Sequence, residues 1–213
     1  MVRPVVALGG PPPTVPAHDG NRWQPNGPVR YMLKPLPIDF GIDPDQVATI
    51  VDDCFQDWQA AGRLPFAFQK VANGDCEITI AWLQNPGPQT DGYVASAEFP
   101  PNTPGTPNQI VFDAAQPWTV SGTANTYDLP TLVRHEIGHA IGLGHSFSGG
   151  LVMSGSIGMG RAISLTQPDI DAAVKLYNPT LLQRVALSLK SLFSSAARGI
   201  ACGALPPATV PPP

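Results

Sequence analysis

Apolar and polar residues alternate in several short stretches of this chain, and such alternation is typical of β-strands that bury one face. Turn-forming residues, mainly proline and glycine, separate these stretches from one another. A proline-rich loop over 100–107 divides the last two. The pattern therefore predicts five strands, over 29–34, 66–68, 77–82, 93–99 and 109–112.

A different period follows the first strand, where apolar residues recur every three or four positions. Asp43 followed by Pro44 is a typical helix start, because an aspartate caps free N–H groups and a proline suits the first turn. Gly62 is a typical helix end. The pattern predicts a long amphipathic helix whose buried stripe is formed by Val47, Ile50, Val51, Cys54, Phe55 and Trp58.

Two more amphipathic helices are predicted in the C-terminal half of the chain. One begins at 128–130 and ends at Gly142. The other begins at 166–169, where Thr166 is a candidate cap and Asp169 lies near the positive end of the helix dipole. The residues expected to face inward are Leu132, Val133, Ile137, Ala140 and Ile141 in the first helix, and Ile170, Val174, Leu176 and Tyr177 in the second.

Prolines concentrate at both ends of the chain, which predicts extended arms around one folded region. Residues 1–28 form a proline-rich arm without hydrophobic periodicity, and the folded domain is expected over 29–178. An extra amphipathic helix is predicted over 179–199, and a proline-rich tail over 200–213. The arms or the extra helix could attach the domain to a larger assembly.

Charge and cysteine content narrow the classes of function. Only 13% of the residues are charged and the net charge is -4, so the chain lacks the positive surface that nucleic-acid binding needs. No run reaches the roughly 18 apolar residues that span a bilayer, and the apolar stretch at the N-terminus is shorter than that of a clear signal peptide. The three cysteines form no C-x-x-C pair, which argues against a thiolate zinc site. A disulfide between Cys54 and Cys76 and two separate buried thiols are both open.

The candidate chemistry lies in one stretch, HEIGHAIGLGH, which ends at His145. His135 and His139 are four residues apart and therefore share a helix face, and Glu136 follows the first of them. Neutral imidazoles bind zinc, and a catalytic zinc site has three protein ligands and a water. A continuing helix would carry His145 away, but Gly142 can adopt a positive φ and reverse the chain, and the next glycine makes that reversal easier. The spacing predicts a zinc site held by three histidines.

This stretch resembles the extended zinc-binding signature HExxHxxGxxH of the metzincin metallopeptidases. Metzincins carry a methionine turn beneath the metal, and Met153, eight residues after His145, is the matching candidate. This interval and the stretch LTQPDIDAAVKLYN resemble the matrixins, the branch similar to matrix metalloproteinases. The resemblance covers residues 29–178. It implies an α+β fold of the zincin type: a twisted mixed five-stranded sheet with a long N-terminal helix, an active-site helix and a C-terminal helix.

Several positions depart from the matrixin pattern. The sequence Ser-Gly-Ser at 154–156 stands where matrixins usually have a proline and a tyrosine that form one wall of the main specificity pocket. Between residues 19 and 134 there is no histidine, so the second, structural zinc of matrixins is not expected. Of the calcium ligands of matrixins, only Asp91 and Asp113 remain as candidates. No cysteine precedes Cys54, so a cysteine switch is not expected in this chain. The resemblance therefore implies one catalytic Zn²⁺, with weak support for Ca²⁺.

The resemblance implies a zinc-dependent endopeptidase acting on a protein or peptide, with Glu136 as general base and Met153 as an apolar floor beneath the ligands. The strand from Tyr93 to Phe99 would then pair with an extended substrate, although an ordinary edge strand would have the same pattern. Two other hypotheses stay open. One is a catalytically weak zinc-fold module with a structural or binding role, and the other is zinc-dependent hydrolysis of a different bond. The resemblance also implies a secreted or extracellular protein.

Overall fold

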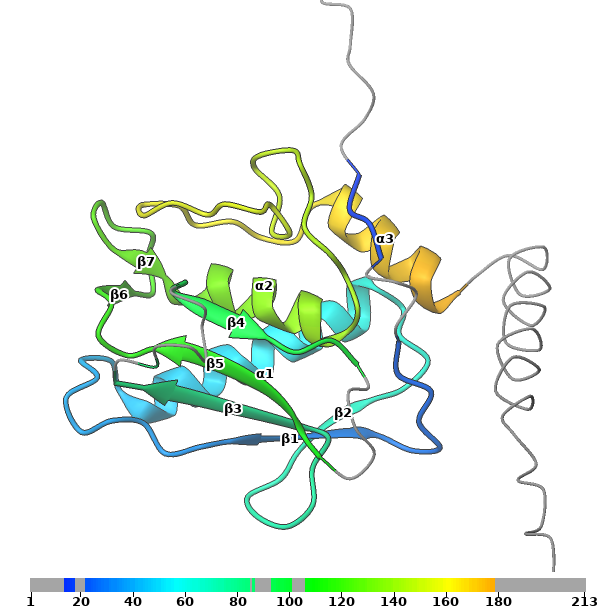
Figure 1. Ribbon diagram of the computed structural model, residues 1–213, viewed down its shortest axis with the longest axis horizontal. Helices are drawn as coiled ribbons and strands as arrows, with labels where there is room; N and C mark the ends of the chain where they lie inside the picture. The colour runs from blue at the N-terminus through cyan, green and yellow to red at the C-terminus, as the bar shows by residue number, and fades with distance from the viewer. Residues whose placement is uncertain (1–13, 18–21, 85, 87–92, 101–105, 179–213) are drawn as a thin grey trace, which may run out of the picture. The chain divides into compact units, whose positions relative to one another are not determined.

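The computed structural model describes residues 14–17, 22–84, 86, 93–100 and 106–178. The helix predicted over 179–199, the tail over 200–213 and the candidate calcium ligand Asp91 lie outside the described residues. Within them the elements follow the order β1, α1, β2, β3, β4, β5, β6, β7, α2 and α3 (Figure 1). None of the helices in this part of the chain is long and apolar enough to cross a membrane.

Five strands form one mixed sheet in the spatial order β2-β1-β3-β5-β4. Four of them run parallel to one another, namely β1 (Val29–Leu33), β2 (Phe68–Lys70), β3 (Ile78–Leu83) and β5 (Asn108–Asp113). The fifth, β4 (Ala95–Ala97), pairs antiparallel with β5 and is an edge strand of this sheet. The mixed five-stranded sheet implied by the resemblance is therefore confirmed, although β2 begins two residues later than predicted and β4 is shorter than 93–99.

Side chains of β3 explain why the centre of the sheet is stable. Ile78, Ile80 and Trp82 alternate with less buried residues and are almost completely shielded from solvent. The Trp82 ring stacks on Phe112 of β5 with a distance of 4.5 Å between the ring centroids. Such burial contributes roughly 2–3 kcal/mol for each large side chain. A second ladder, between β6 (Trp118–Thr119) and β7 (Tyr127–Asp128), was not predicted because two residues are too few to alternate.

Helix α1 (Pro44–Ala61) begins and ends close to the predicted positions. The carboxylate of Asp43 accepts hydrogen bonds from the backbone N–H groups of Asp45 and Gln46, at 2.9 and 3.1 Å. Its buried stripe is the predicted one except for Ile50, which is half-buried. Helices α1 and α2 (Leu129–Ala140) pack against each other and cover the sheet (Figure 1).

Helix α3 (Gln167–Tyr177) is rotated relative to the prediction. Leu176 and Tyr177 are buried as predicted, but Ile170 and Val174 are only half-buried, and the rest of the buried face is formed by Asp169, Ala172 and Ala173. Small residues face inward here because α3 lies close to the end of α1. A β-carbon placed on Gly62 would lie 3.0 Å from the β-carbon of Ala173. The close approach of α3 to α1, and not hydrophobicity alone, determines which residues of α3 face inward.

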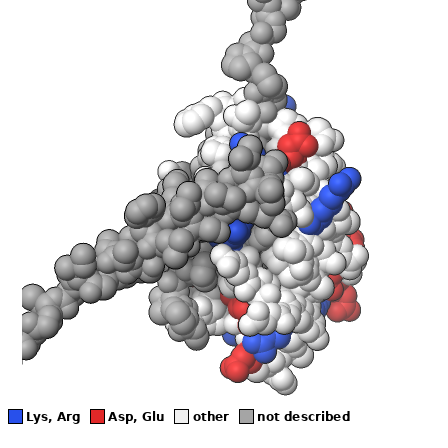
Figure 2. All heavy atoms as spheres, turned by 90° about the vertical axis from the view of Figure 1, so that its right-hand side faces the viewer, with Lys and Arg blue, Asp and Glu red and all other residues white. Residues whose placement is uncertain are grey.

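The described surface carries few charges. Figure 2 shows one face of the molecule, on which single Lys, Arg, Asp and Glu side chains are dispersed over mostly uncharged surface. Both Cys54 and Cys76 are buried free thiols, so the disulfide left open by the sequence is not formed. Burial raises the pKa of the Cys54 thiol to about 12, which keeps it protonated and unreactive.

Candidate metal centre

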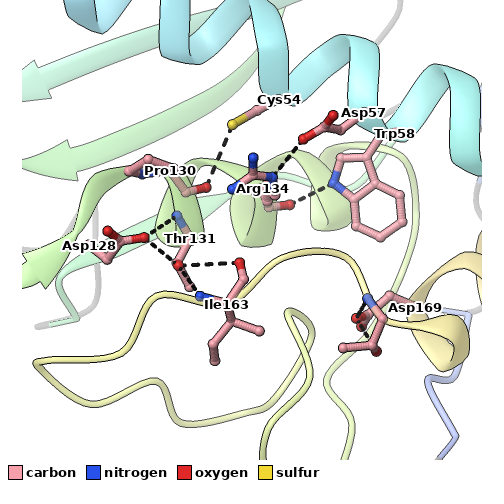
Figure 3. Close-up of polar contacts among 10 residues, drawn as sticks. Cys54, Asp57, Trp58, Asp128, Pro130, Thr131, Arg134, Ile163 and Asp169 are labelled. Carbon is pink, nitrogen blue, oxygen red and sulfur yellow. Dashed lines mark hydrogen bonds and ion pairs between the residues drawn. The ribbon is translucent and has the colours of Figure 1, made fainter. Parts of the chain in front are cut away.

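Helix α2 carries the first two histidines and is held on α1 by polar contacts as well as apolar packing. Arg134 forms an ion pair with Asp57 at 2.8 Å (Figure 3). The indole N–H of Trp58 donates to the carbonyl of Arg134 at 2.8 Å, and the Cys54 thiol contacts the carbonyl of Pro130 at 3.6 Å. These contacts come from two successive turns of α1. They fix both the rotation and the axial position of α2, and hence the direction of its histidine side chains.

The three predicted histidines converge on one point. The Nε2 atom of His139 lies 3.1 Å from that of His135 and 2.9 Å from that of His145, and the remaining Nε2 pair is 3.2 Å apart. Nitrogens that bind one zinc at 2.0–2.1 Å with tetrahedral angles lie roughly 3.3 Å from one another. Among the described residues, this is the group of side chains that could hold a metal ion.

Hydrogen bonds at the other ring nitrogen set the tautomer of two of these histidines. Nδ1 of His135 lies 2.6 Å from the carbonyl oxygen of Val152, and Nδ1 of His139 lies 2.7 Å from that of Leu143. A carbonyl oxygen only accepts, so each Nδ1 carries the proton and each Nε2 presents a lone pair. Two lone pairs at 3.1 Å cannot hydrogen-bond to each other. The donor set therefore fits a divalent cation between them, and the group is a suitable zinc site.

The protonation state of the histidines also favours metal binding. Burial lowers the pKa of His135 to about 4, an effect to which the charge of His145 adds and which the hydrogen bond to Val152 opposes. Burial also lowers the pKa of His145. Neutral imidazole is the form that binds zinc, because the ligand nitrogen must be deprotonated. These two rings are neutral near pH 7 and need not lose a proton.

Glu136 lies beside the histidines and is 3% exposed. Its Oε2 atom is buried and has no hydrogen-bond partner among the residues that the structure describes. Burial raises the pKa of this carboxyl to about 8, so the metal-free site holds it largely protonated at neutral pH. A buried carboxyl without a protein donor is costly for stability, which is typical of a group kept for chemistry.

The reversal that brings His145 back occurs where the sequence predicted it. Gly142 has a φ of 102°, a conformation that side chains disfavour. Gly144 has no positive φ, so the left-handed conformation in this turn is that of Gly142. The N–H of Gly144 donates to the carbonyl of Pro16 at 2.7 Å, and Ala17 forms a β-bridge with Leu143. Segment 14–17 thus contacts the chain directly after the turn.

Both ends of the domain meet at the end of α2. The indole N–H of Trp23 donates to the carbonyl of Ala140 at 2.8 Å, and the hydroxyl of Tyr177 donates to that of Ile141 at 2.7 Å. The backbone N–H of Trp23 donates in turn to the Tyr177 hydroxyl at 3.2 Å. Carbonyls at a helix end lack partners within the helix. These two side chains satisfy them directly before the turn at Gly142.

Met153 is fully buried and lies against Gly138, which stands between the two helical histidines in the sequence. A β-carbon on Gly138 would overlap its sulfur and lie 3.0 Å from its Cε, so the glycine between the two helical histidines admits the methionine. The turn is held from α3: the carboxylate of Asp169 accepts hydrogen bonds from the backbone N–H groups of Val152 and Met153, both at 3.1 Å. Asp169 is completely buried and therefore has a second role besides its predicted one at the helix start.

The histidines and Glu136 lie along a cleft of about 770 Å³. Described residues from 93 to 97 and Phe99 line this cleft, so the structure brings the predicted strand next to the histidines. Leu132 of α2, Tyr127 and the segment 154–157 line it as well. The candidate calcium ligand Asp113 already accepts hydrogen bonds from the backbone of Ala115 and the side chain of Gln116, at 2.9 and 2.8 Å.

Sequence reasoning missed residues that act on the site from a distance. Trp23, Arg134 and Tyr177 have no chemical motif around them, and their partners lie far away in the sequence. For Trp23 and Tyr177 the only signal was the residue type, since buried indole N–H and phenol groups require a hydrogen-bond partner.

Comparison with known proteins gives one family. Residues 22–178 match the family model described as Matrixin. Neutrophil collagenase from Homo sapiens is 31% identical over 140 residues, which cover 62% of this chain and 29% of the collagenase. Interstitial collagenase from Sus scrofa is 28% identical over 165 residues, covering 75% of this chain and 33% of that protein. Matrix metalloproteinase-26 from Homo sapiens is 38% identical over 87 residues, or 38% of this chain and 32% of that protein.

The chain thus spans about a third of the length of these curated relatives. The matching region contains the sheet, all three described helices and the three converging histidines. The chain belongs to the matrixin family of zinc metalloendopeptidases.

Proposed function

We propose that this domain hydrolyses peptide bonds as a zinc endopeptidase, with His135, His139 and His145 as the zinc ligands and Glu136 as the general base. The observation that carries the proposal is the convergence of three Nε2 atoms beside a buried carboxyl in an open cleft. Bound zinc supplies a Lewis acid, which polarises the scissile carbonyl and lowers the pKa of a water.

In this mechanism Glu136 accepts the proton of the attacking water and later delivers it to the leaving amine. Its burial supports this role, because a raised pKa stabilises the protonated carboxyl that must donate in the second step. The Nδ1 hydrogen bonds of His135 and His139 hold both rings in one orientation throughout. We assign Met153 no bond to the metal; it is the apolar floor on which the histidine rings rest.

We propose that the peptide substrate binds along β4. The support is that β4 is at the edge of the sheet, and that residues 93–97 line the cleft next to the histidines. An extended peptide can add to such an edge through main-chain hydrogen bonds. The scissile bond would then lie across the three imidazoles, within reach of Glu136.

The test is cleavage of casein or gelatin by the zinc-loaded protein and by its Glu136→Ala variant. We expect the variant to keep its zinc and lose at least about a hundredfold in rate, because general base catalysis typically contributes that much. Asp53→Asn is the matched control, since Asp53 is an exposed carboxylate of α1. Undiminished turnover by Glu136→Ala would refute the assignment. A zinc-loaded wild type that cleaves no peptide would instead favour a structural or binding module, or hydrolysis of another bond.

Location and larger organisation are further proposals. We propose an extracellular protein in which residues 29–178 form the catalytic domain and the flanking segments, 1–28 and 179–213, connect it to a larger assembly. The family supports the first part. The contacts of residues 14–17 and Trp23 with the end of α2 indicate that part of the N-terminal arm is attached to the domain.

A further inference from the structure

One wall of the cleft is formed by a segment without regular structure. Residues 155–166, between the methionine turn and α3, contain neither helix nor strand. The first of them, with Ser154, line the same cleft as β4. In this chain the wall begins with Ser-Gly-Ser, so it has no bulky side chains of its own at these positions. Its distance from α2 must therefore be set by whatever holds the segment in place.

Two of the hydrogen bonds that hold this segment join it to Thr126 and Thr131. The N–H of Gly160 donates to the carbonyl of Thr126 at 2.9 Å. The N–H of Ile163 donates to the side-chain hydroxyl of Thr131 at 2.8 Å (Figure 3). The same hydroxyl donates to the carboxylate of Asp128 at 2.6 Å. This chain of contacts, from Asp128 through Thr131 to Ile163, connects the wall to the first turn of α2.

Only a hydroxyl can occupy the middle of this chain. Its single proton is directed to the Asp128 carboxylate at 2.6 Å, which is nearer than the other acceptor, the carbonyl of Ile163 at 3.3 Å. Its lone pair accepts the amide proton of Ile163. Asp128 also caps α2 and accepts from the backbone N–H of Gly122 at 2.9 Å. Thr131 is completely buried and Asp128 is 4% exposed, so neither group can exchange its partner for water. Loss of the hydroxyl leaves the amide of Ile163 without its acceptor and removes one of the hydrogen bonds that the Asp128 carboxylate accepts.

We propose that Thr131 is a positioning residue that sets the width of the substrate pocket and thereby selects the side chain it accepts. This inference rests on the proposed peptidase function. Thr131 lies one turn before His135 on the same helix, and its neighbour Leu132 lines the cleft. The contact therefore joins the outer wall to the helix that carries the reacting groups. Tyr127, Leu132 and Ile157 are among the residues that line the cleft, so it offers apolar surface to a side chain next to the scissile bond.

The test compares Thr131→Val with Thr131→Ser in the zinc-loaded full chain. The measurement is kcat/KM for two peptides that differ only in carrying leucine or alanine directly after the scissile bond. We expect Thr131→Val to change the leucine-to-alanine ratio at least about fivefold, which corresponds to one lost hydrogen bond. Thr131→Ser should keep the ratio within about twofold. Thr49→Val is the matched control, because Thr49 is exposed on α1 and bonds only within its own helix.

Zinc content separates positioning of the wall from damage to the metal site. Zinc content should be equal in the wild type and the three variants, because the hydroxyl of Thr131 bonds to Asp128 and Ile163 and to none of the histidines. An equal loss on both peptides, with the ratio unchanged, would overturn the proposal. So would a Thr131→Ser variant that behaves like Thr131→Val.

A second measurement does not depend on activity or on the folding of a variant. Amide hydrogen exchange of the unaltered, metal-free protein should show Ile163 protected at least about tenfold above Ser164 and Arg161 in the same segment. Equal exchange of these three amides would overturn the proposal. If the wild type cleaves neither peptide but Ile163 is protected, the peptidase function fails while the contact that positions the wall is retained.

Discussion

The buried carboxyl of Glu136 should lower the free energy of unfolding when the metal is absent. Its carboxyl has an ordinary pKa of 4.5 and a pKa of about 8 in the folded, metal-free protein, because burial disfavours the charged form. The folded state therefore binds this proton more tightly than the unfolded state does. For an acid with a raised pKa, stability falls as the pH rises from the unfolded pKa to the folded one. Glu136→Gln removes the titration and should stabilise the metal-free protein above pH 5.

The two pKa values give the size of the effect. At pH 8 linkage predicts that the ionisable side chain lowers the free energy of unfolding by about 4 kcal/mol relative to glutamine, and at pH 5 by only about 1 kcal/mol. A difference of this size is a large part of the stability of an ordinary domain. Zinc should reduce it, because a nearby cation lowers the pKa of a carboxyl.

The assay is urea unfolding of the chelator-treated wild type and Glu136→Gln at pH 5, 6, 7 and 8. We expect the two curves to separate steadily with pH and to approach each other again when zinc is restored. Asp53→Asn should change stability by less than about 0.5 kcal/mol at every pH, since its carboxylate is exposed. A pH-independent difference between wild type and Glu136→Gln would show that the carboxyl is not buried as described, and would refute the reasoning.

Two further predictions concern the floor and the end of the active-site helix. Gly138→Ala should lower stability by several kcal/mol and weaken zinc retention in a chelator competition, because the new methyl group overlaps Met153 and lies 3.1 Å from the ring of Trp58; unchanged retention would mean that the methionine does not support the ligands. Tyr177→Phe should cost about 1–3 kcal/mol in thermal or urea unfolding, because it leaves the buried Ile141 carbonyl without its donor. A loss below about 0.5 kcal/mol would contradict that role.

Local patterns in the sequence predicted the elements whose causes are local. Asp43 and Asp128 cap their helices as expected, because capping depends on a side chain and the next few backbone amides. The convergence of the histidines followed from a four-residue spacing and one glycine with a positive φ. Both depend on fewer than a dozen consecutive residues, so the sequence alone was sufficient.

Features set by distant contacts could not be predicted in this way. Asp169 was expected only to favour the start of α3, but it is completely buried because amides 16 and 17 residues earlier in the chain bond to it. The rotation of α3 follows from the close approach of Ala173 to Gly62, which no hydrophobic period reveals. Trp23 and Tyr177 meet across 154 residues. In each case the partner is chosen by the packing of whole elements.

The contacts of Asp169 have a consequence for the order in which parts of the domain can fold during synthesis of the chain. When residue 160 has just emerged from the ribosome, the nascent chain outside it already contains the three histidines of the metal group and Met153. It still lacks the carboxylate to which the amides of Val152 and Met153 bond. The turn that carries Met153 can take its final form only after α3 has emerged, so this turn is completed only when almost all of the domain has been translated.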